Sequence, residues 1–579
     1  MNSPDASAHA LHETLNLTTR KFVQDVLDSL SAGQRLESER IFKALTASLA
    51  QDSEYWAEIQ KRYYQRHLEL WMNLAQTDGA AKPETVVAPD QGDRRFHAPE
   101  WQKLPFFAYL KQAYLLNSRW LSEMVEAVRL DAQDKNKLRF FTHQLIDAAA
   151  PTNFLATNPE VLKLASETNG KSLLRGIEQL DADLKKGRIS MTDETAFEIG
   201  RNIAVTPGTV VFENELIQLI QYQATTDTVY ERPLVMVPPC INKYYILDLQ
   251  PENSFVRYAV SQGHTVFMVS WRNVAENMGH ITWDQYLEAG VIKAMEVARE
   301  IRGVGQVNAL GFCVGGTMLG AALGVLRAKD RNPAASLTLL AAMLDFGDTG
   351  QLSVFVDEAY VKQRERDFAG GGVLHGKQLA LTFSSLRAND LIWNYVVNNY
   401  LKGRKPEPFD LLHWNSDSTN LPGAMYVYYV RNMYLENNLR VPGKLTMCGV
   451  PVDLSQLRMP AYVQASREDH IVPWKTAFQS TRLLGGDIEF VLAASGHIAG
   501  VVNPASKNKR HYWLNPISSA SPDDWFAGAR QQPGSWWNHW SAWLAGHGGS
   551  SVPAPIKPGN ARYPGIEPAP GRYVRVRCD

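Results

Sequence analysis

The chain has 579 residues, of which 45% are hydrophobic and 21% charged, and its formal net charge is -1 at pH 7. This composition is typical of a globular protein with an ample core, and the small net charge excludes a global electrostatic attraction to nucleic acid or to an anionic membrane. The four cysteines are scattered without C-x-x-C spacing, which argues against a metal site and favours a reducing compartment. The opening MNSPDASAHALHETLN lacks the basic and apolar segments of a signal peptide, so we expect a cytoplasmic protein.

Residues 1–195 predict a helical, non-catalytic domain. Phe22, Val26 and Leu30 recur at four-residue spacing, and the aromatic-rich segment 101–128 keeps the same helical period. Residues 77–99 are rich in Gly, Pro and charge and predict a loop or linker. No catalytic motif occurs in this region, so we interpret it as a packing or interaction domain.

Residues 196–579 show a different pattern, in which strands and helices alternate. The expected strands are 209–212, 216–222, 233–237, 265–270, 306–310, 335–343, 461–464 and 488–492, and the expected helices are 251–262, 283–302 and 314–326. Such alternation predicts an α/β catalytic domain with a mostly parallel sheet flanked by helices. Between about 345 and 441 the alternation stops, and this polar, aromatic stretch is expected to be an inserted cap or lid, with an ordinary packing domain as the alternative.

A candidate nucleophile follows the strand 306–310. Gly311 and Gly315 stand two positions before and after Cys313, the spacing of the nucleophile elbow of α/β-hydrolases with Cys in place of Ser. A strand turns sharply into a helix at such a site, and any side chain at the flanking positions would collide with backbone. The helix N-terminus favours the thiolate of Cys313. Two alternatives remain: a buried structural cysteine, and a transmembrane helix over the uncharged residues 303–326, against which its glycines and polar residues argue.

A candidate acid and base follow two later strands. Asp469 and His497 come after 461–464 and 488–492, so that Cys313, Asp469 and His497 have the hydrolase order of nucleophile, acid and base at the carboxyl edge of the sheet. His497 would accept the Cys313 proton, and Asp469 would orient the imidazole. Asp345, which also ends a strand, and Glu468 remain alternatives for the acid.

The loop after 233–237 reads Pro-Pro-Cys240-Ile241. In α/β-hydrolases this loop supplies one backbone N–H of the oxyanion hole, and the two prolines leave the Cys240 and Ile241 amides free to point at a carbonyl oxygen. The alternatives are an ordinary rigid turn, or a second nucleophile at Cys240, which lacks an elbow.

A family resemblance rests on several motifs distributed along the chain. These are PPCINKYYILDLQPENS, GHTVFMVSWRN, GFCVGGT, WNSDSTNLPG, VPGKLTMCGVPVDL, SREDHIVPW and SGHIAGVVNP. The chain resembles the polyhydroxyalkanoate synthases over nearly its whole length, most closely class I, and least in the first hundred residues. The resemblance implies Cys313 as the acyl-carrying nucleophile, Asp469 and His497 as its acid and base, and Val314 and Cys240 as the oxyanion amides. Phe312, where medium-chain relatives usually carry Ala, favours short-chain substrates.

The resemblance also implies a reaction and partners. We expect an α/β-hydrolase core that polymerises (R)-3-hydroxyacyl-CoA, such as (R)-3-hydroxybutyryl-CoA, into polyester through an acyl-cysteine, with no cofactor beyond the CoA of the substrate. A thiolate that attacks a thioester forms another thioester, so the acyl group stays activated for transfer. The expected partners are the growing polyester, a second copy in a homodimer, and the polymer granule with its associated proteins, contacted through the N-terminal domain. A thioesterase or simple acyltransferase, and a non-catalytic granule-coating protein, remain alternatives.

Overall fold

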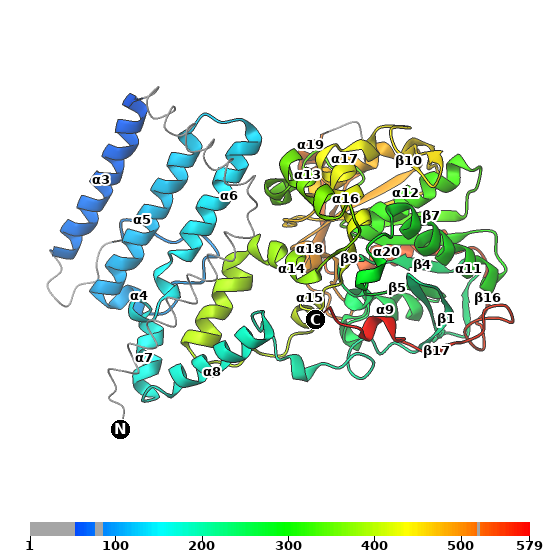
Figure 1. Cartoon of the computed structure of the whole chain (residues 1–579), viewed down its shortest axis with the longest axis horizontal. Helices are drawn as coiled ribbons and strands as arrows, with labels where there is room; N and C mark the ends of the chain where they lie inside the picture. The colour runs from blue at the N-terminus through cyan, green and yellow to red at the C-terminus, as the bar shows by residue number, and fades with distance from the viewer. Residues whose placement is uncertain (1–52, 76–84, 518–520, 579) are drawn as a thin grey trace. The chain divides into compact units, whose positions relative to one another are not determined.

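The computed structural model describes residues 53–75, 85–517 and 521–578, many of whose elements are labelled in Figure 1. By their contacts these residues form two compact units. The smaller unit contains the described residues up to Pro151 and the segment Asp357–Gln363, and the larger contains Thr152–Val356 and the chain from Arg364 onward. From the helical pattern of 1–195 we expected the boundary between the two domains at residue 195. In the structure, residues 152–195 belong to the larger unit by their contacts.

The smaller unit is helical, as predicted. Its helices are α3 (Ser53–Ala75), α4 (Glu100–Lys103), α5 (Pro105–Ala127) and α6 (Ala132–Ala148). Trp101 is fully buried in their core, and the Tyr114 hydroxyl of α5 donates a hydrogen bond to the Ile146 carbonyl of α6 (3.0 Å). Residues 85–99 form a loop, as expected, whereas Phe22, Val26 and Leu30 lie outside the described residues.

The described part of the larger unit is built on an 11-stranded sheet in the order β15-β14-β13-β12-β7-β6-β4-β5-β2-β1-β17. The central strands from β13 to β5 are parallel, and those at both edges are antiparallel. The strands are β1 (Gly208–Glu213), β2 (Ile217–Tyr222), β4 (Leu234–Val237), β5 (Val266–Trp271), β6 (Val307–Phe312), β7 (Ala334–Leu340), β12 (Ala461–Ser466), β13 (Ile488–Ala493), β14 (His511–Leu514), β15 (Arg530–Pro533) and β17 (Glu567–Pro568). The predicted α/β class with a mostly parallel sheet is therefore confirmed.

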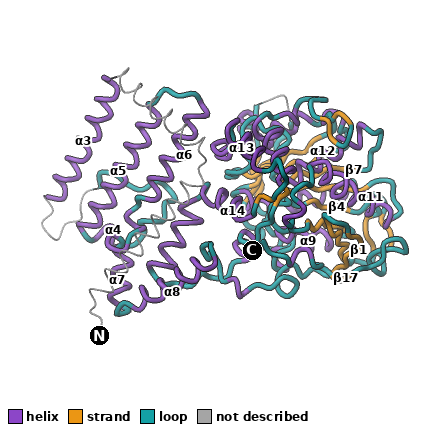
Figure 2. Tube along the Cα trace, viewed as in Figure 1, coloured by secondary structure: helices purple, strands orange, loops and turns teal. Residues whose placement is uncertain are grey.

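Helices pack against this sheet, as the colouring of Figure 2 shows. They are α9 (Phe255–Ser261), α10 (Trp283–Gln285), which continues through the π-helix η7 (Tyr286–Ile292) into α11 (Lys293–Arg302), α12 (Val314–Ala328), α17 (Trp474–Ser480), α18 (His497–Val501), α19 (Pro522–Ala527) and α20 (Trp537–Ala545). Every residue of α12 from Val314 to Leu326 is buried, which accounts for its uncharged sequence. The transmembrane interpretation of 303–326 is wrong, because this stretch contains β6 and α12, and no described helix is long and apolar enough to cross a membrane.

The insertion predicted after residue 345 lies between β7 and β12. It contains α13 (Glu358–Asp367), α14 (Gly376–Ser385), the π-helices η9 (Asn389–Trp393) and η10 (Val396–Leu401), α15 (Asp410–Asn415), α16 (Gly423–Tyr429) and the π-helix η11 (Val430–Leu435). The two helices α7 (Pro159–Glu167) and α8 (Lys171–Lys186) join the larger unit because α8 packs on η10. The Tyr400 hydroxyl donates a hydrogen bond to Asp183 (2.8 Å), and a Cβ on Gly176 would lie 1.9 Å from the Tyr400 carbonyl oxygen.

Candidate active site

Cys313 lies at the apex of a sharp turn between β6 and α12. Its backbone has φ 54° and ψ −129°, a conformation that is strained for a residue with a side chain. The Cys313 N–H donates to the Leu340 carbonyl at the end of β7 (2.9 Å), and the Cys313 carbonyl accepts from the Gly316 N–H (2.8 Å). These bonds hold the strained residue in place at the sharp turn that the elbow spacing predicts.

The glycines around Cys313 are required by packing. A Cβ on Gly311 would lie 2.4 Å from the Cα of Gly316, and one on Gly315 would lie 2.2 Å from the carbonyl oxygen of Val237. Both obstacles are backbone atoms, so neither position accepts a side chain. The spacing thus reflects the contact of the start of α12 with both β6 and β4.

His497 and Asp469 meet in the interior beside this turn. His497 Nδ1 lies 2.6 Å from Asp469 Oδ2, and Asp469 Oδ1 accepts hydrogen bonds from the backbone N–H groups of Ile471 and Val472, both at 2.8 Å. These three bonds fix the carboxylate, which in turn fixes the imidazole. The other ring nitrogen, Nε2, is left for the Cys313 thiol, which lies close enough to influence the pKa of His497. The structure therefore brings all three predicted residues together.

The environment of His497 favours its charged form. Burial alone would lower the pKa of His497, but the Asp469 carboxylate and the Cys313 sulfur, each by charge and by hydrogen bonding, raise it to about 10. The Phe312 ring packs on the imidazole, with ring centroids 5.5 Å apart and 25° between the planes. The structure thus holds a charged imidazole beside the Cys313 side chain.

The two alternatives for the acid lie elsewhere. Asp345 accepts hydrogen bonds from the Asn437 side chain and the Gly347 N–H (both 2.8 Å) and lies 3.6 Å from Arg440. Glu468 is exposed, next to Asp469. The imidazole of His497 is thus paired with Asp469.

The two predicted oxyanion donors lie on segments that touch each other, the start of α12 and the loop after β4. Val314 is the first residue of α12, and Cys240 follows the two prolines after β4; the contact of Gly315 with Val237 and Pro238 joins the two segments. Within the part of the chain that the structure describes, neither the Val314 nor the Cys240 N–H donates a hydrogen bond to the backbone carbonyl of another residue. Cys240 is almost completely buried, and burial raises the pKa of its thiol well above the usual range, so its protonated form argues against a second nucleophile.

Two tyrosines of the inserted segment also reach this site, and the sequence analysis missed them. Burial raises the pKa of Tyr434, and the charges of the neighbouring Cys313 and Asp469 raise it further. Burial also raises the pKa of Tyr429, and the neighbouring Tyr434 and Cys313 add to that effect. Their rings meet edge to face at 5.4 Å. The sequence signal was only the aromatic richness of the segment, because the π-helix η11 that places Tyr434 has no recognisable spacing.

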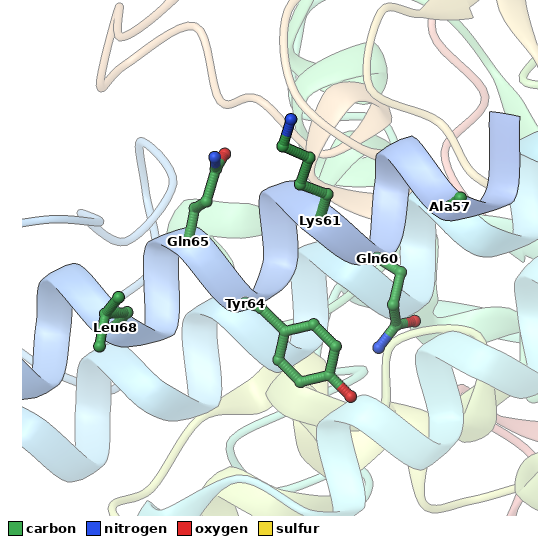
Figure 3. Close-up of a pocket in the computed structure, with 6 residues that line it drawn as sticks. All are labelled: Ala57, Gln60, Lys61, Tyr64, Gln65 and Leu68. Atoms are coloured by element: carbon green, nitrogen blue, oxygen red, sulfur yellow. The ribbon is translucent and has the colours of Figure 1, made fainter. Parts of the chain in front are cut away.

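Two other features bear on ligand binding, a pocket along α3 and the arrangement of metal-binding side chains. The pocket in Figure 3 runs along α3 and is lined by Ala57, Gln60, Lys61, Tyr64, Gln65 and Leu68, all from that one helix, so it lacks the walls of an enclosed ligand site. Among the described residues, no group of His, Cys, Asp and Glu is arranged to hold a metal ion.

Comparison with known proteins identifies the family. Residues 92–259 match the family described as the poly-beta-hydroxybutyrate polymerase N-terminus, and residues 233–504 match the alpha/beta hydrolase fold, which confirms the predicted fold. The chain is 55% identical over 90% of its length to a poly(3-hydroxyalkanoate) polymerase subunit of Cupriavidus necator, covering 88% of that protein. It is 40% identical over 92% of its length to that of Rhizobium meliloti, covering 89%. The chain therefore belongs to the poly(3-hydroxyalkanoate) polymerases, a family of acyltransferase enzymes on the α/β-hydrolase fold.

Proposed function

We propose that this enzyme polymerises (R)-3-hydroxyacyl-CoA, in particular short-chain substrates such as (R)-3-hydroxybutyryl-CoA, through an acyl-Cys313 intermediate. The observation that carries the proposal is the set of Cys313, His497 and Asp469, with the cysteine on a strained elbow and the buried imidazole held by the buried carboxylate. The names of its relatives, poly(3-hydroxyalkanoate) polymerases, support the substrate class.

The first step forms the acyl-enzyme. The Cys313 thiolate attacks the thioester carbonyl carbon, and the carbonyl oxygen becomes an oxyanion that accepts hydrogen bonds from the Val314 and Cys240 N–H groups. The tetrahedral intermediate collapses by breaking the bond to the CoA sulfur, which leaves with the proton held by His497. The product is a thioester on Cys313, so the acyl group remains activated.

The second step lengthens the chain. His497, now neutral, accepts the proton of a 3-hydroxyl group while its oxygen attacks the acyl-Cys313 carbonyl carbon, and the cysteine sulfur leaves as a thiolate beside the renewed imidazolium. Water would compete for the same carbonyl and release free acid. Tyr429 and Tyr434, which are near enough to Cys313 for its charge to raise their pKa values, would exclude part of that water.

The preference for short acyl chains rests on Phe312. Its ring is fully buried and stacks on His497, so the wall beside the nucleophile is filled by an aromatic side chain. An alanine there would leave room for a longer acyl side chain. We therefore expect the acyl group of the substrate to be a short-chain 3-hydroxyacyl group.

We further propose that the enzyme acts as a homodimer in the cytoplasm, associated with polyester granules. Exposed apolar side chains on α3 support contact with a polyester surface: Tyr64, Leu68 and Trp71 are 62%, 58% and 61% exposed and recur with the helical period. Replacing the three by Ser should reduce co-sedimentation with polymer particles without changing turnover of soluble substrate. Analytical ultracentrifugation of the wild type tests the dimer.

Turnover of (R)-3-hydroxybutyryl-CoA tests the reaction. Purified wild type and Cys313→Ala are compared by thiol release and by recovery of chloroform-soluble polymer. We expect both from the wild type and neither from the variant. Thiol release with only free hydroxy acid would identify a thioesterase instead, and polymer from Cys313→Ala would exclude the acyl-cysteine.

A further inference from the structure

The loop that carries Cys240 has no regular structure of its own. It leaves β4 at Val237 and only enters the short 3-10 helix η4 (Tyr244–Leu247) afterwards, so contacts with other segments must fix the direction of the Cys240 N–H. On one side the Trp271 indole N–H donates to the Pro238 carbonyl (2.9 Å). On another, the Ile241 carbonyl accepts from the Thr419 N–H of the inserted segment (2.7 Å).

The third contact is made by a segment more than three hundred positions away. Lys243 follows Cys240 by three residues, and its ammonium donates a hydrogen bond to the Val576 carbonyl (2.5 Å). The next carbonyl, that of Arg577, accepts a hydrogen bond from the Asn273 side chain (3.1 Å). We call residues 567–578 the closing segment; it also supplies β17, which pairs with β1.

Lys243 is an unusual lysine. It is only 3% exposed, and burial lowers its pKa, with the nearby Asp417 carboxylate opposing that effect. Its ammonium donates a hydrogen bond to a backbone carbonyl, which carries no charge. Buried ammonium groups are costly, and a core position of this kind would be filled at lower cost by an apolar side chain.

The Lys243 backbone is held as well. Its carbonyl accepts a hydrogen bond from the Trp414 indole (2.7 Å), and the Tyr245 hydroxyl two residues later donates to Asp417 (2.9 Å). Lys243 thus links the inserted segment, through its carbonyl, to the closing segment, through its ammonium. Both links are within three residues of Cys240.

We propose that Lys243 is a positioning residue for the oxyanion hole, and that the closing segment acts on catalysis through it. The ammonium ties the Cys240 loop to the Val576 carbonyl and so keeps the Cys240 N–H aimed at the carbonyl oxygen of the thioester. The inference rests on the proposed function, in which Cys240 is an oxyanion donor. It predicts a defect confined to steps that form an oxyanion.

Two reactions of Cys313 separate this effect from general damage. Acylation by a thioester passes through a tetrahedral oxyanion, whereas alkylation by iodoacetamide displaces iodide at a saturated carbon and forms none. In Lys243→Met, which removes the ammonium and keeps the side chain's length, we expect acylation to slow by about 10- to 100-fold with KM little changed, because loss or misplacement of an oxyanion donor costs rate of this order. Alkylation should keep the wild-type rate.

Two further variants complete the experiment. A chain ending at Arg575, which lacks the Val576 carbonyl, should reproduce the defect, and combining it with Lys243→Met should add little more. Arg572→Ala is the matched control, because Arg572 also belongs to the closing segment but forms ion pairs with Glu213 and Glu567 instead of contacting the Cys240 loop, and its side chain is 53% exposed. This variant should be acylated at the wild-type rate.

The outcomes are distinguishable. A wild type that is alkylated but never acylated by the thioester would refute the proposed function itself. Normal acylation in Lys243→Met, an equal slowing of alkylation and acylation, or normal acylation in the shortened chain would each overturn the positioning role. If Lys243→Met does not fold, the shortened chain alone decides between these results.

Discussion

Replacing Asp248 by asparagine tests how much a buried charge weakens the larger unit. Asp248 is 1% exposed, and its Oδ1 accepts hydrogen bonds from the hydroxyls of Thr206 (2.5 Å) and Ser254 (2.6 Å). Its Oδ2 has no hydrogen-bond partner among the residues that the structure describes. An asparagine amide would keep both bonds at its oxygen and place an N–H donor where Oδ2 now lies.

The magnitude follows from the pKa of Asp248. Burial is the largest influence and raises this pKa from 3.8 to about 6, although the Ser254 and Thr206 hydroxyls oppose it. A folded-state pKa above the unfolded value means that the protonated form stabilises the fold; this stability is present below about pH 4 and is lost as pH rises toward 6. A difference of about two pKa units corresponds to about 3 kcal/mol, so Asp248→Asn should be up to about 3 kcal/mol more stable than wild type at pH 7.

Urea unfolding followed by tryptophan fluorescence measures this effect. Midpoints are compared at about pH 4 and pH 7, because a chain of two units need not unfold in one step and extrapolated free energies would mislead. Asp330→Asn is the control, since the Asp330 side chain is 99% exposed. A stability gap that is the same at both pH values, or an asparagine variant weaker than wild type at pH 7, would refute the reasoning.

Two other predictions concern the site. Asp469→Asn keeps an oxygen acceptor for the Ile471 and Val472 amides but presents an amide N–H to His497, so the imidazole takes the tautomer that cannot accept the thiol proton. We expect kcat for thiol release to fall by about 10²- to 10⁴-fold. An unchanged kcat would contradict the pairing of His497 with Asp469. Gly315→Ala should be inactive or insoluble, because its Cβ would meet the Val237 carbonyl at 2.2 Å, whereas Gly305→Ala, with nothing within 4 Å, should match wild type in solubility and thiol release.

The local parts of the site were predictable because their geometry depends on residues that lie close together in the sequence. The spacing of Gly311, Cys313 and Gly315 encodes a turn in which backbone touches backbone, and a contact of that kind leaves few sequences that fit. The placement of Asp469 and His497 after parallel strands follows from sheet topology, since such strands all end at one edge.

The parts that could not be predicted depend on contacts between distant segments. Nothing near Lys243 in the sequence signals that the Val576 carbonyl accepts a hydrogen bond from its ammonium. The Pro- and Arg-rich stretch after residue 550 carried no structural prediction. The unit boundary was placed at 195 because α7 and α8 have the same helical pattern as the helices before them. Only their packing on η10 assigns them to the larger unit.

The closing segment also determines when, during synthesis, the catalytic unit can be completed. Gln218 of β2 hydrogen-bonds to Glu567 across 349 positions, and Lys243 to Val576 across 333. At ribosomal rates this separation is on the order of half a minute, during which the early strands exist without the segment that covers them. Cys313, Asp469 and His497 all emerge before residue 576, so the nucleophile is present on the nascent chain while the loop of Cys240 still lacks its last contact. With Lys243 positioning the Cys240 loop as proposed above, we expect full activity only after synthesis has passed the closing segment.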